Sequence, residues 1–237
     1  MTVTYEIGTD RVAHVHMDDG KANALNGESC TALTDAIARA GDDGAGALVI
    51  WGRDGVFSGG IDLAVLRDDD ANRRFATLTQ IAHTLLGVWM APIPTVAAVT
   101  GHAIAGGAIL AMACDRGVGV TGVMKLGANE TALGMVFPTW AKAIIESAIP
   151  TAYRTDVMLM GQLFDPEEAV KMGIITAAVA PDSLTTAIDE VTAKLVDLPT
   201  RAYAMNKRKL RAASADAAAA LVGAEMGMGF GRQESPS

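Results

Sequence analysis

Residues 101–115, GHAIAGGAILAMACD, constrain the fold of this chain more than any other stretch. Small residues fill the front of the stretch, and the apolar run from Ile109 to Met112 predicts the first turns of a buried helix. The adjacent glycines Gly106 and Gly107 let another group approach the backbone without meeting a β-carbon. The first N–H groups of a helix have no internal partner and lie at the positive end of its dipole. The pattern is therefore typical of either a tightly packed helix or a site for an oxygen atom that gains negative charge.

Length and composition exclude several classes of protein. The 237 residues are enough for one large domain, or for one domain with an appendage. A net charge of −8 argues against general nucleic-acid binding. The most apolar span, residues 88–114, is broken by prolines and glycines, so it predicts a buried strand and a buried helix instead of a membrane span. With no apolar signal region at residues 1–11, and with Cys30 and Cys114 in apolar surroundings, we expect a cytoplasmic protein with buried free thiols.

Periodicity predicts alternating strands and helices, with no linker and no visible internal repeat. We expect a hairpin at residues 3–7 and 11–17, further strands at 47–51, 95–99 and 174–179, and helices at 27–40, 70–89, 141–148, 153–160, 165–173, 183–195 and 201–227. Asn23 and Asn26 are typical turn and capping residues before the first helix. His14 and His16 fall on one face of the second strand, and no further metal ligands follow at matching spacing, which favours an ordinary strand face.

A strand, a glycine-rich turn and a short helix occur in that order twice, at residues 48–66 and 95–112. The first turn contains Gly59 and Gly60, with Ile61 and Asp62 at the start of the next helix. It lacks the P-loop and dinucleotide-binding glycine patterns, and Asp62 is expected to cap the helix or bind loop amides. Two such turns supply two backbone N–H donors for one oxygen. The duplication favours an oxyanion hole over simple helix packing.

Four motifs together resemble the successive signatures of the enoyl-CoA hydratase/isomerase (crotonase) family. They are NAL at residues 23–25, FSGGIDL at 57–63, GHAIAGGAILAMACD at 101–115 and GANETALGMVFP at 127–138, in the family's order and spacing. The resemblance implies an α/β fold, a spiral of repeated strand–strand–helix units followed by C-terminal helices that build a trimer. We assign residues 1–180 to the spiral core, which binds the acyl-CoA and catalyses, and 181–237 to the C-terminal helical region.

The resemblance also implies an acyl-CoA thioester substrate whose carbonyl oxygen lies between two backbone N–H groups. Carried over by position, these donors are Ile61 and Gly106. The substrate is expected to contact eight further positions: Lys21, Ala22, Ala24, Gly60, Asp62, Leu63, Gly107 and Ile109. Coenzyme A is part of the substrate, so no separate cofactor and no metal site are expected, and nucleic acid and membrane are not expected partners.

One departure from the family pattern predicts the reaction. Family hydratases carry a glutamate three residues after the second oxyanion glycine and another at the position of Glu130, but the first position here is Ile109. The stretch around Glu130 looks most like the 3,2-trans-enoyl-CoA isomerases, which use one glutamate base. Two alternatives stay open, a hydratase or other thioester-enolate enzyme with a second acid from elsewhere, and a non-catalytic acyl-CoA-binding subunit. Without the resemblance, Glu130 is more typical of a surface or helix-start residue.

The C-terminal part carries a basic cluster in an otherwise acidic chain: Arg201, Lys207, Arg208, Lys209 and Arg211. The cluster is either a solvated helix face or a contact for the phosphates of coenzyme A. The alanine-rich residues 212–222 predict a broad apolar face, which supports the homotrimer or dimer of trimers that the resemblance implies. The glycine-rich and polar end, residues 227–237, is expected to fray.

Overall fold

The computed structural model describes residues 2–227, whose strands form two sheets. The larger sheet has the order β1-β2-β3-β5-β7-β9, with the bounds β1 (Thr2–Ile7), β2 (Val12–Asp18), β3 (Ala47–Trp51), β5 (Thr95–Val99), β7 (Arg116–Val120) and β9 (Ala177–Val179). β1 and β2 are antiparallel, as predicted for a hairpin, and the other pairs are parallel. The strand predicted at residues 174–179 is shorter than expected, and β7 was not predicted.

The second sheet is small, fully parallel and absent from the sequence prediction. It has the order β4-β6-β8, with β4 (Gly55–Ser58), β6 (Gly101–Ile104) and β8 (Leu126–Gly127). Each of its strands directly follows a strand of the larger sheet in the chain. The pairs are β3–β4, β5–β6 and β7–β8, and in each pair the first strand belongs to the larger sheet and the second to the small sheet. A helix follows each pair. These are the repeated strand–strand–helix units of the predicted spiral.

The helices begin and end close to the predicted positions. They are α1 (Gly27–Asp42), α2 (Leu63–Leu66), α3 (Ala71–Met90), α4 (Gly106–Ala113), α5 (Thr139–Ala148), α6 (Arg154–Met158), α7 (Pro166–Met172), α8 (Leu184–Leu195) and α9 (Thr200–Gly227), with 3-10 turns η1 (Glu130–Leu133), η2 (Thr151–Tyr153) and η3 (Pro181–Ser183). Asn26 caps α1 in a capping box with Ser29, and Asp165 caps α7, which ends at Gly173 in the left-handed conformation. Both caps were predicted.

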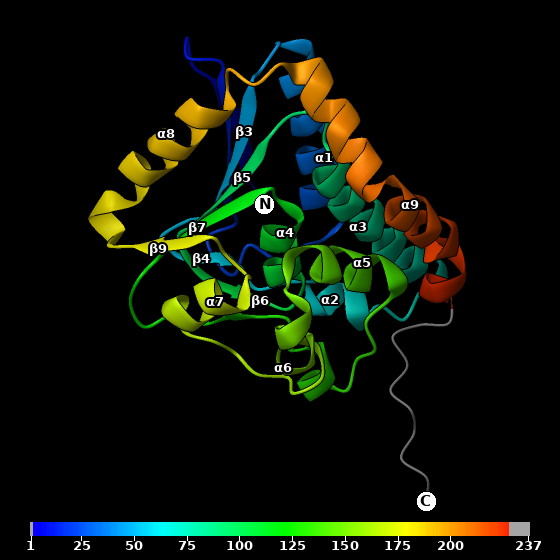
Figure 1. Ribbon diagram of the computed structural model, residues 1–237. Coiled ribbons are helices and arrows are strands. Elements are labelled where there is room, and N and C mark those ends of the chain that lie inside the picture. The colour runs from blue at the N-terminus through cyan, green and yellow to red at the C-terminus, as the bar shows by residue number, and fades with distance from the viewer. Residues whose placement is uncertain (1, 228–237) are drawn as a thin grey trace, which may run out of the picture.

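The core lies between the larger sheet and the helices on its two faces. Figure 1 shows α8 on one side of this sheet and α1 and α3 on the other. Every residue of β5 is buried, and so are the first four of β3, which explains why both strands are unbroken apolar runs. Cys30 and Cys114 are buried free thiols, as predicted. No helix in residues 2–227 is long and apolar enough to cross a membrane.

Helix α9 packs back onto the core instead of standing apart from it. Figure 1 shows this long helix running beside α3 and α5. Ala215, Ala218, Val222 and Met226 are buried there, so part of the apolar face predicted at residues 212–222 is covered within the same chain. Leu221 on the same helix is exposed. The predicted fraying concerns residues that lie beyond Gly227 and outside the described part of the chain.

Candidate active site

Three loops that carry predicted site residues begin at the carboxyl ends of β4, β6 and β8. Because these three strands are parallel neighbours, the loops leave from the same edge of the small sheet. Ile61 lies in the loop after β4, Gly106 follows β6, and Glu130 follows β8. The carboxyl ends of parallel strands are the usual place for ligands in open α/β sheets. The second sheet is thus the element that gathers the predicted site.

The first loop is held by the segment that precedes α1. Leu25 N–H donates to Gly60 O over 2.8 Å, and Asp62 N–H donates to Leu25 O over 2.9 Å. Gly60 has a φ of +89°, which a residue with a side chain adopts only with strain. These bonds flank Ile61 on both sides, and within residues 2–227 the Ile61 N–H itself has no hydrogen-bond acceptor. It is a free donor at the edge of the small sheet.

The second loop turns sharply at Ala105, which has φ 50° although it carries a β-carbon. Its N–H donates to Gly127 O over 2.8 Å, and α4 begins at the next residue, Gly106. A β-carbon on Gly60 would lie 2.9 Å from Gly106 N, and one on Gly106 would lie 3.5 Å from Ile61 Cγ1. The two loops therefore meet backbone to backbone. This arrangement brings the two predicted N–H donors, Ile61 and Gly106, together at the start of α4.

Gly107 has a packing role that the sequence analysis offered as the simpler alternative for the glycine pair. A β-carbon here would lie 2.1 Å from Ser58 O, so α4 sits directly on the end of β4. Asp62, also a predicted contact, accepts a hydrogen bond from Ala64 N over 2.9 Å and caps α2, as predicted. Leu63 is exposed on the first turn of that helix. The roles of these three residues in substrate binding stay predictions.

Glu130 is buried, and one oxygen of its carboxylate has no hydrogen-bond partner among the described residues. Only 6% of the residue is exposed, and the oxygen without a partner is Oε2. Burial raises the pKa of this carboxyl to about 7, against a smaller opposing effect of its own backbone N–H. Apart from the family resemblance, Glu130 was expected at the surface or at the start of a helix. The surface location is wrong, whereas the residue does begin η1. A buried carboxylate of this kind exchanges protons near neutral pH, as a general base requires.

Ile109 lies one turn into α4 and is buried. Every described residue of this helix is buried as well, so the surroundings of Ile109 are apolar. A carboxylate at this position would need a hydrogen-bond partner or would titrate at a raised pKa. Among the described residues, Glu130 is thus a buried carboxylate at the start of η1, and Ile109 occupies the position of the other glutamate of family hydratases.

A family model for enoyl-CoA hydratase/isomerase matches residues 8–233. The chain belongs to the enoyl-CoA hydratase/isomerase family. It is 26% identical to the mitochondrial enoyl-CoA delta isomerase 1 of Rattus norvegicus over 212 residues, which are 88% of this chain and 73% of the relative. The crystal structure of an enoyl-CoA hydratase from Mycobacterium ulcerans matches with 32% identity and a TM-score of 0.89, covering 97% of this chain and 99% of the other.

The fold of this family member is the crotonase fold. The human mitochondrial delta3-delta2-enoyl-CoA isomerase has a TM-score of 0.93, with 24% identity and coverage of 97% of this chain and 91% of that structure. Some of the matching relatives are named isomerases and others are named hydratases, and their identities to this chain are similar. The comparisons therefore establish the family and the fold, and leave the choice of reaction to the chemistry of the site.

The predicted contacts before α1 form a loop whose backbone is hydrogen-bonded to the loop after β4. Ala22 O accepts a hydrogen bond from Gly59 N over 2.7 Å, and Lys21 O accepts one from Arg53 Nε over 2.7 Å. Lys21 and Ala22 are exposed, and Ala24 is half-buried. Contact of these three residues with substrate stays a prediction.

Asn23 is a positioning residue that the sequence analysis treated only as a turn or capping residue. It is fully buried, and its side-chain N–H group donates to Met17 O over 2.8 Å and Phe57 O over 3.2 Å. These bonds join the end of β2 to β4, directly before the Gly59–Gly60 turn. The NAL motif at residues 23–25 was the available signal, since asparagine tolerates the left-handed conformation that Asn23 adopts here with φ 48°.

The basic cluster divides into structural and exposed members. Lys207 is buried, and its Nζ lies 2.8 Å from Asp115 Oδ2; Arg211 Nη1 lies 2.9 Å from Asp115 Oδ1. These two ion pairs fix α9 to the end of α4, so Lys207 and Arg211 are not part of a solvated helix face. The exposed members Arg201, Arg208 and Lys209 keep both interpretations open.

The histidines on β2 follow the strand-face interpretation. His14 Nδ1 accepts a hydrogen bond from Trp51 Nε1 over 3.0 Å, and His16 Nε2 lies 3.7 Å from Glu6 Oε1. The rings of His16 and Trp51 stack with centroids 5.7 Å apart. Within residues 2–227, no group of three or more His, Cys, Asp or Glu side chains has the geometry to hold a metal ion.

Proposed function

We propose that this protein moves the double bond of a 3-enoyl-CoA to the 2-trans position, with Glu130 as its single base. The observation that carries the proposal is a buried carboxylate with a pKa of about 7 and no partner for its Oε2 atom, in a site where Ile109 replaces the second glutamate of the hydratases. The family of the chain supports the thioester substrate. The isomerase named among its relatives supports the reaction.

In the proposed reaction, the Glu130 carboxylate takes a proton from the carbon alpha to the thioester. The electron pair of that C–H bond moves into a dienolate, whose oxygen accepts hydrogen bonds from the N–H groups of Ile61 and Gly106. The same carboxyl then returns the proton to the gamma carbon, so the double bond shifts with no net gain or loss of atoms. Each N–H donor in such a hole contributes about 2.7–4 kcal/mol to transition-state stabilisation. The reaction needs neither a metal nor a cofactor beyond the coenzyme A of the substrate.

Ile109 supports isomerisation over hydration because hydration needs a held and activated water molecule. An apolar residue at this position removes one of the two carboxylates that would bind that water, and it lowers the access of water to the dienolate. A hydratase with a second acid from another segment is the alternative. Its support is the hydratase name of some relatives.

The direct test compares two substrates. Purified protein is incubated separately with 3-hexenoyl-CoA and crotonyl-CoA, and the products are followed by absorbance and chromatography. The proposal predicts that isomerisation of the first is faster than hydration of the second. Faster hydration would refute it. The Ile109→Glu variant sharpens the result, because it restores the paired carboxylates and is expected to gain hydration at some cost in stability.

A non-catalytic acyl-CoA-binding subunit is the proposal from a different class. Both proposals need the N–H donors, so acyl-CoA binding does not separate them, whereas turnover of any 3-enoyl-CoA does. We further propose that the protein works in the cytoplasm, supported by its two buried free thiols, and as a homotrimer or dimer of trimers. Exposed Leu221 on α9 supports the assembly, and light scattering of the eluted protein tests it.

A further inference from the structure

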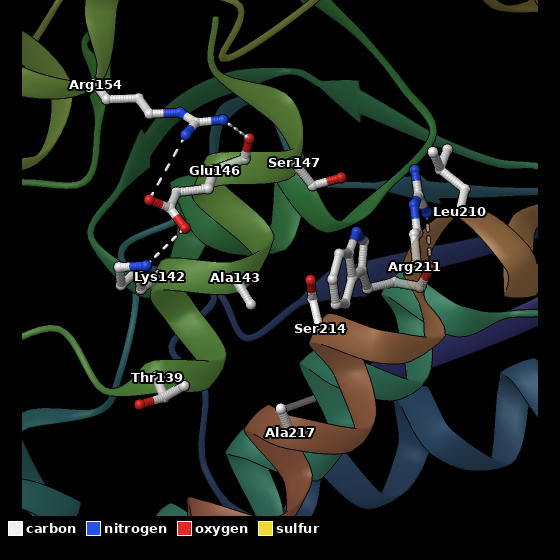
Figure 2. A pocket seen from close by; sticks show the side chains of 11 residues that line it. Thr139, Lys142, Ala143, Glu146, Ser147, Arg154, Leu210, Arg211, Ser214 and Ala217 are labelled. Carbon is white, nitrogen blue, oxygen red and sulfur yellow. Dashed lines mark hydrogen bonds and ion pairs between the residues drawn. The ribbon is translucent and has the colours of Figure 1, made fainter. Parts of the chain in front are cut away.

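A hollow of about 540 Å³ lies between α5 and α9. It is lined by the side of α5 that faces α9, by part of α9, and by Trp89 at the end of α3. None of the predicted catalytic or substrate-binding residues lines it. Figure 2 shows Ser147 on α5 and Ser214 on α9 on opposite sides of the space between these helices. The volume is in the range of small-molecule sites.

Two buried N–H groups of the lining residues have no acceptor within residues 2–227. They are Trp89 Nε1, in a side chain that is almost fully buried, and Arg211 Nε. The guanidinium of Arg211 is fixed, because its Nη1 donates to Trp89 O over 2.7 Å and lies 2.9 Å from Asp115 Oδ1. A buried donor without a partner destabilises the folded protein, because it has lost its hydrogen bonds to water. A ligand that offers acceptor oxygens to both groups offsets this destabilisation.

The lining of the hollow is positive in a chain of net charge −8. Three cationic residues, Lys142, Arg154 and Arg211, line it together with one acidic residue, Glu146. Glu146 is already matched, since Lys142 Nζ lies 2.7 Å and Arg154 Nη1 3.6 Å from its carboxylate oxygens. Figure 2 shows these pairs at a distance from Ser214 and Arg211. Asp115, the partner of Arg211, is also balanced by Lys207.

One end of the hollow is unfavourable for an anion, because a carboxylate already lies beside it. At this end, Thr139 N–H and Thr139 Oγ1 both donate to the carboxylate of Glu225, over 2.9 and 2.5 Å. A second negative group beside Glu225 would be repelled. The ligand therefore fits the other end, where Ser147, Ser214, Trp89 and Arg211 are the polar lining residues.

We propose that this end of the hollow binds a phosphate or carboxylate group of a small molecule. Oxygen atoms of the ligand accept hydrogen bonds from Arg211 Nε, Trp89 Nε1 and the two serine hydroxyls. An arginine that is already fixed by other contacts binds an oxyanion with little loss of conformational entropy. Two sources carry the same chemistry, a free metabolite and the phosphates of coenzyme A.

The test uses inorganic phosphate as the probe, in a buffer of constant ionic strength that contains no other oxyanion. Titration calorimetry of the full chain should show saturable binding. At a phosphate concentration of ten times Kd, the midpoint of thermal unfolding should rise by about 3–6 °C. The Ser214→Leu variant fills the hollow and should lose both effects. Ala213→Leu, which adds the same side chain at an exposed neighbouring position outside the lining, should keep them.

An absence of saturable binding in the unmodified protein, or equal binding by the Ser214→Leu variant, would overturn the proposal. Should Ser214→Leu fail to fold, the double variant Ser147→Ala and Ser214→Ala removes both hydroxyls without added volume and should weaken binding at least tenfold. Competition with coenzyme A separates the two sources. A phosphate site on the free protein that coenzyme A leaves unaffected belongs to a free metabolite, and displacement by coenzyme A assigns it to the substrate. This test measures binding alone, so it is independent of the isomerase assay.

Discussion

Asp115 and Glu130 are both carboxylates within the fold, but their surroundings are opposite. Asp115 follows α4 and accepts hydrogen bonds from Thr95 N–H over 2.8 Å and from Thr95 Oγ1 over 3.0 Å. Lys207 and Arg211 each lie within 3 Å of it. Within residues 2–227, Glu130 forms no ion pair with a cation, and its Oε2 atom has no hydrogen-bond partner. One carboxylate is fully committed to structure, and the other is left available.

The pKa values of the two carboxyls follow from this difference. Burial alone would raise the pKa in both cases. In Asp115 burial is the largest single effect, but the combined effects of Lys207, Tyr203 and Arg211 outweigh it, so the pKa lies below its ordinary value. In Glu130 nothing outweighs burial, and the pKa rises to about 7. The comparison teaches that partners, more than burial, decide whether an acidic side chain holds the fold together or is free to transfer a proton.

The largest expected effect is on catalysis. Glu130→Gln keeps the shape of the side chain and removes the base, so kcat/KM for 3-hexenoyl-CoA should fall by about 10²–10⁴-fold, with binding of the substrate nearly retained. Glu167→Gln, an exposed change on α7, is the matched control and should leave the rate unchanged. A normal rate for Glu130→Gln would mean that another residue carries the proton.

The counterpart at Asp115 should affect stability instead. Asp115→Asn leaves the buried Lys207 without its counter-charge, so the free energy of unfolding should fall by about 3–5 kcal/mol. Urea denaturation followed by circular dichroism measures this change. For the molecules that remain folded, kcat should stay within about twofold of the unmodified value, since this residue is outside the proposed site. A loss of stability below about 1 kcal/mol would contradict the structural role.

The contributions of the two carboxyls to the free energy of unfolding should change with pH in opposite directions. Between about pH 4.5 and 7, the folded protein keeps the Glu130 proton while the unfolded chain has lost it, so the contribution of Glu130 falls as pH rises through this window. For Asp115, whose pKa is lowered, the contribution is present above its unfolded pKa and is lost as the pH falls. The effect of Glu130→Gln on the free energy of unfolding should therefore depend on pH. It should be more stabilising at pH 8 than at pH 5, by roughly 1–3 kcal/mol. The opposite slope would contradict the raised pKa.

A third carboxylate, Glu225, should give the smallest effect. It accepts two hydrogen bonds at the start of α5. The N-cap residue of this helix, Pro138, makes no capping hydrogen bond with its side chain. Glu225→Gln keeps one acceptor oxygen and loses the favourable charge near the helix N-terminus, which should cost about 0.3–1 kcal/mol in the free energy of unfolding. Thermal unfolding against the unmodified protein measures it. A loss of stability as large as that of Asp115→Asn would contradict the claim that the partners of a carboxylate decide its contribution to stability.

The parts of the fold that depend on residues close together in the sequence could be predicted from it. The caps at Asn26 and Asp165, the long helices and the apolar strands follow from local patterns, and the structure confirms them. The small sheet was missed because its strands have only two to four residues, too few for a period to show. Yet this sheet brings the three site loops to one edge, so the architecture of the site came from family resemblance and not from periodicity.

The roles of Lys207 and Arg211 were missed for a different reason. Their partner Asp115 lies 92 residues before Lys207 in the chain, and a contact of that range leaves no local pattern. As a run of charges the cluster looked like a solvated face or a phosphate site. The burial of Glu130 was likewise invisible locally, because η1 offers no apolar run to mark it. Long-range pairing, more than local propensity, decides the fate of charged residues in this chain.

The measurement that tests the central claim most directly is the exchange of solvent deuterium into the alpha position of a bound acyl-CoA. It needs no knowledge of the natural acyl group, and mass spectrometry of the recovered thioester reads it out. The account predicts exchange by the unmodified protein, with a rate that increases as the pH rises through about 7, and a loss of about 10²-fold or more in Glu130→Gln. Binding of several acyl lengths without exchange, or equal exchange by the variant, would contradict it.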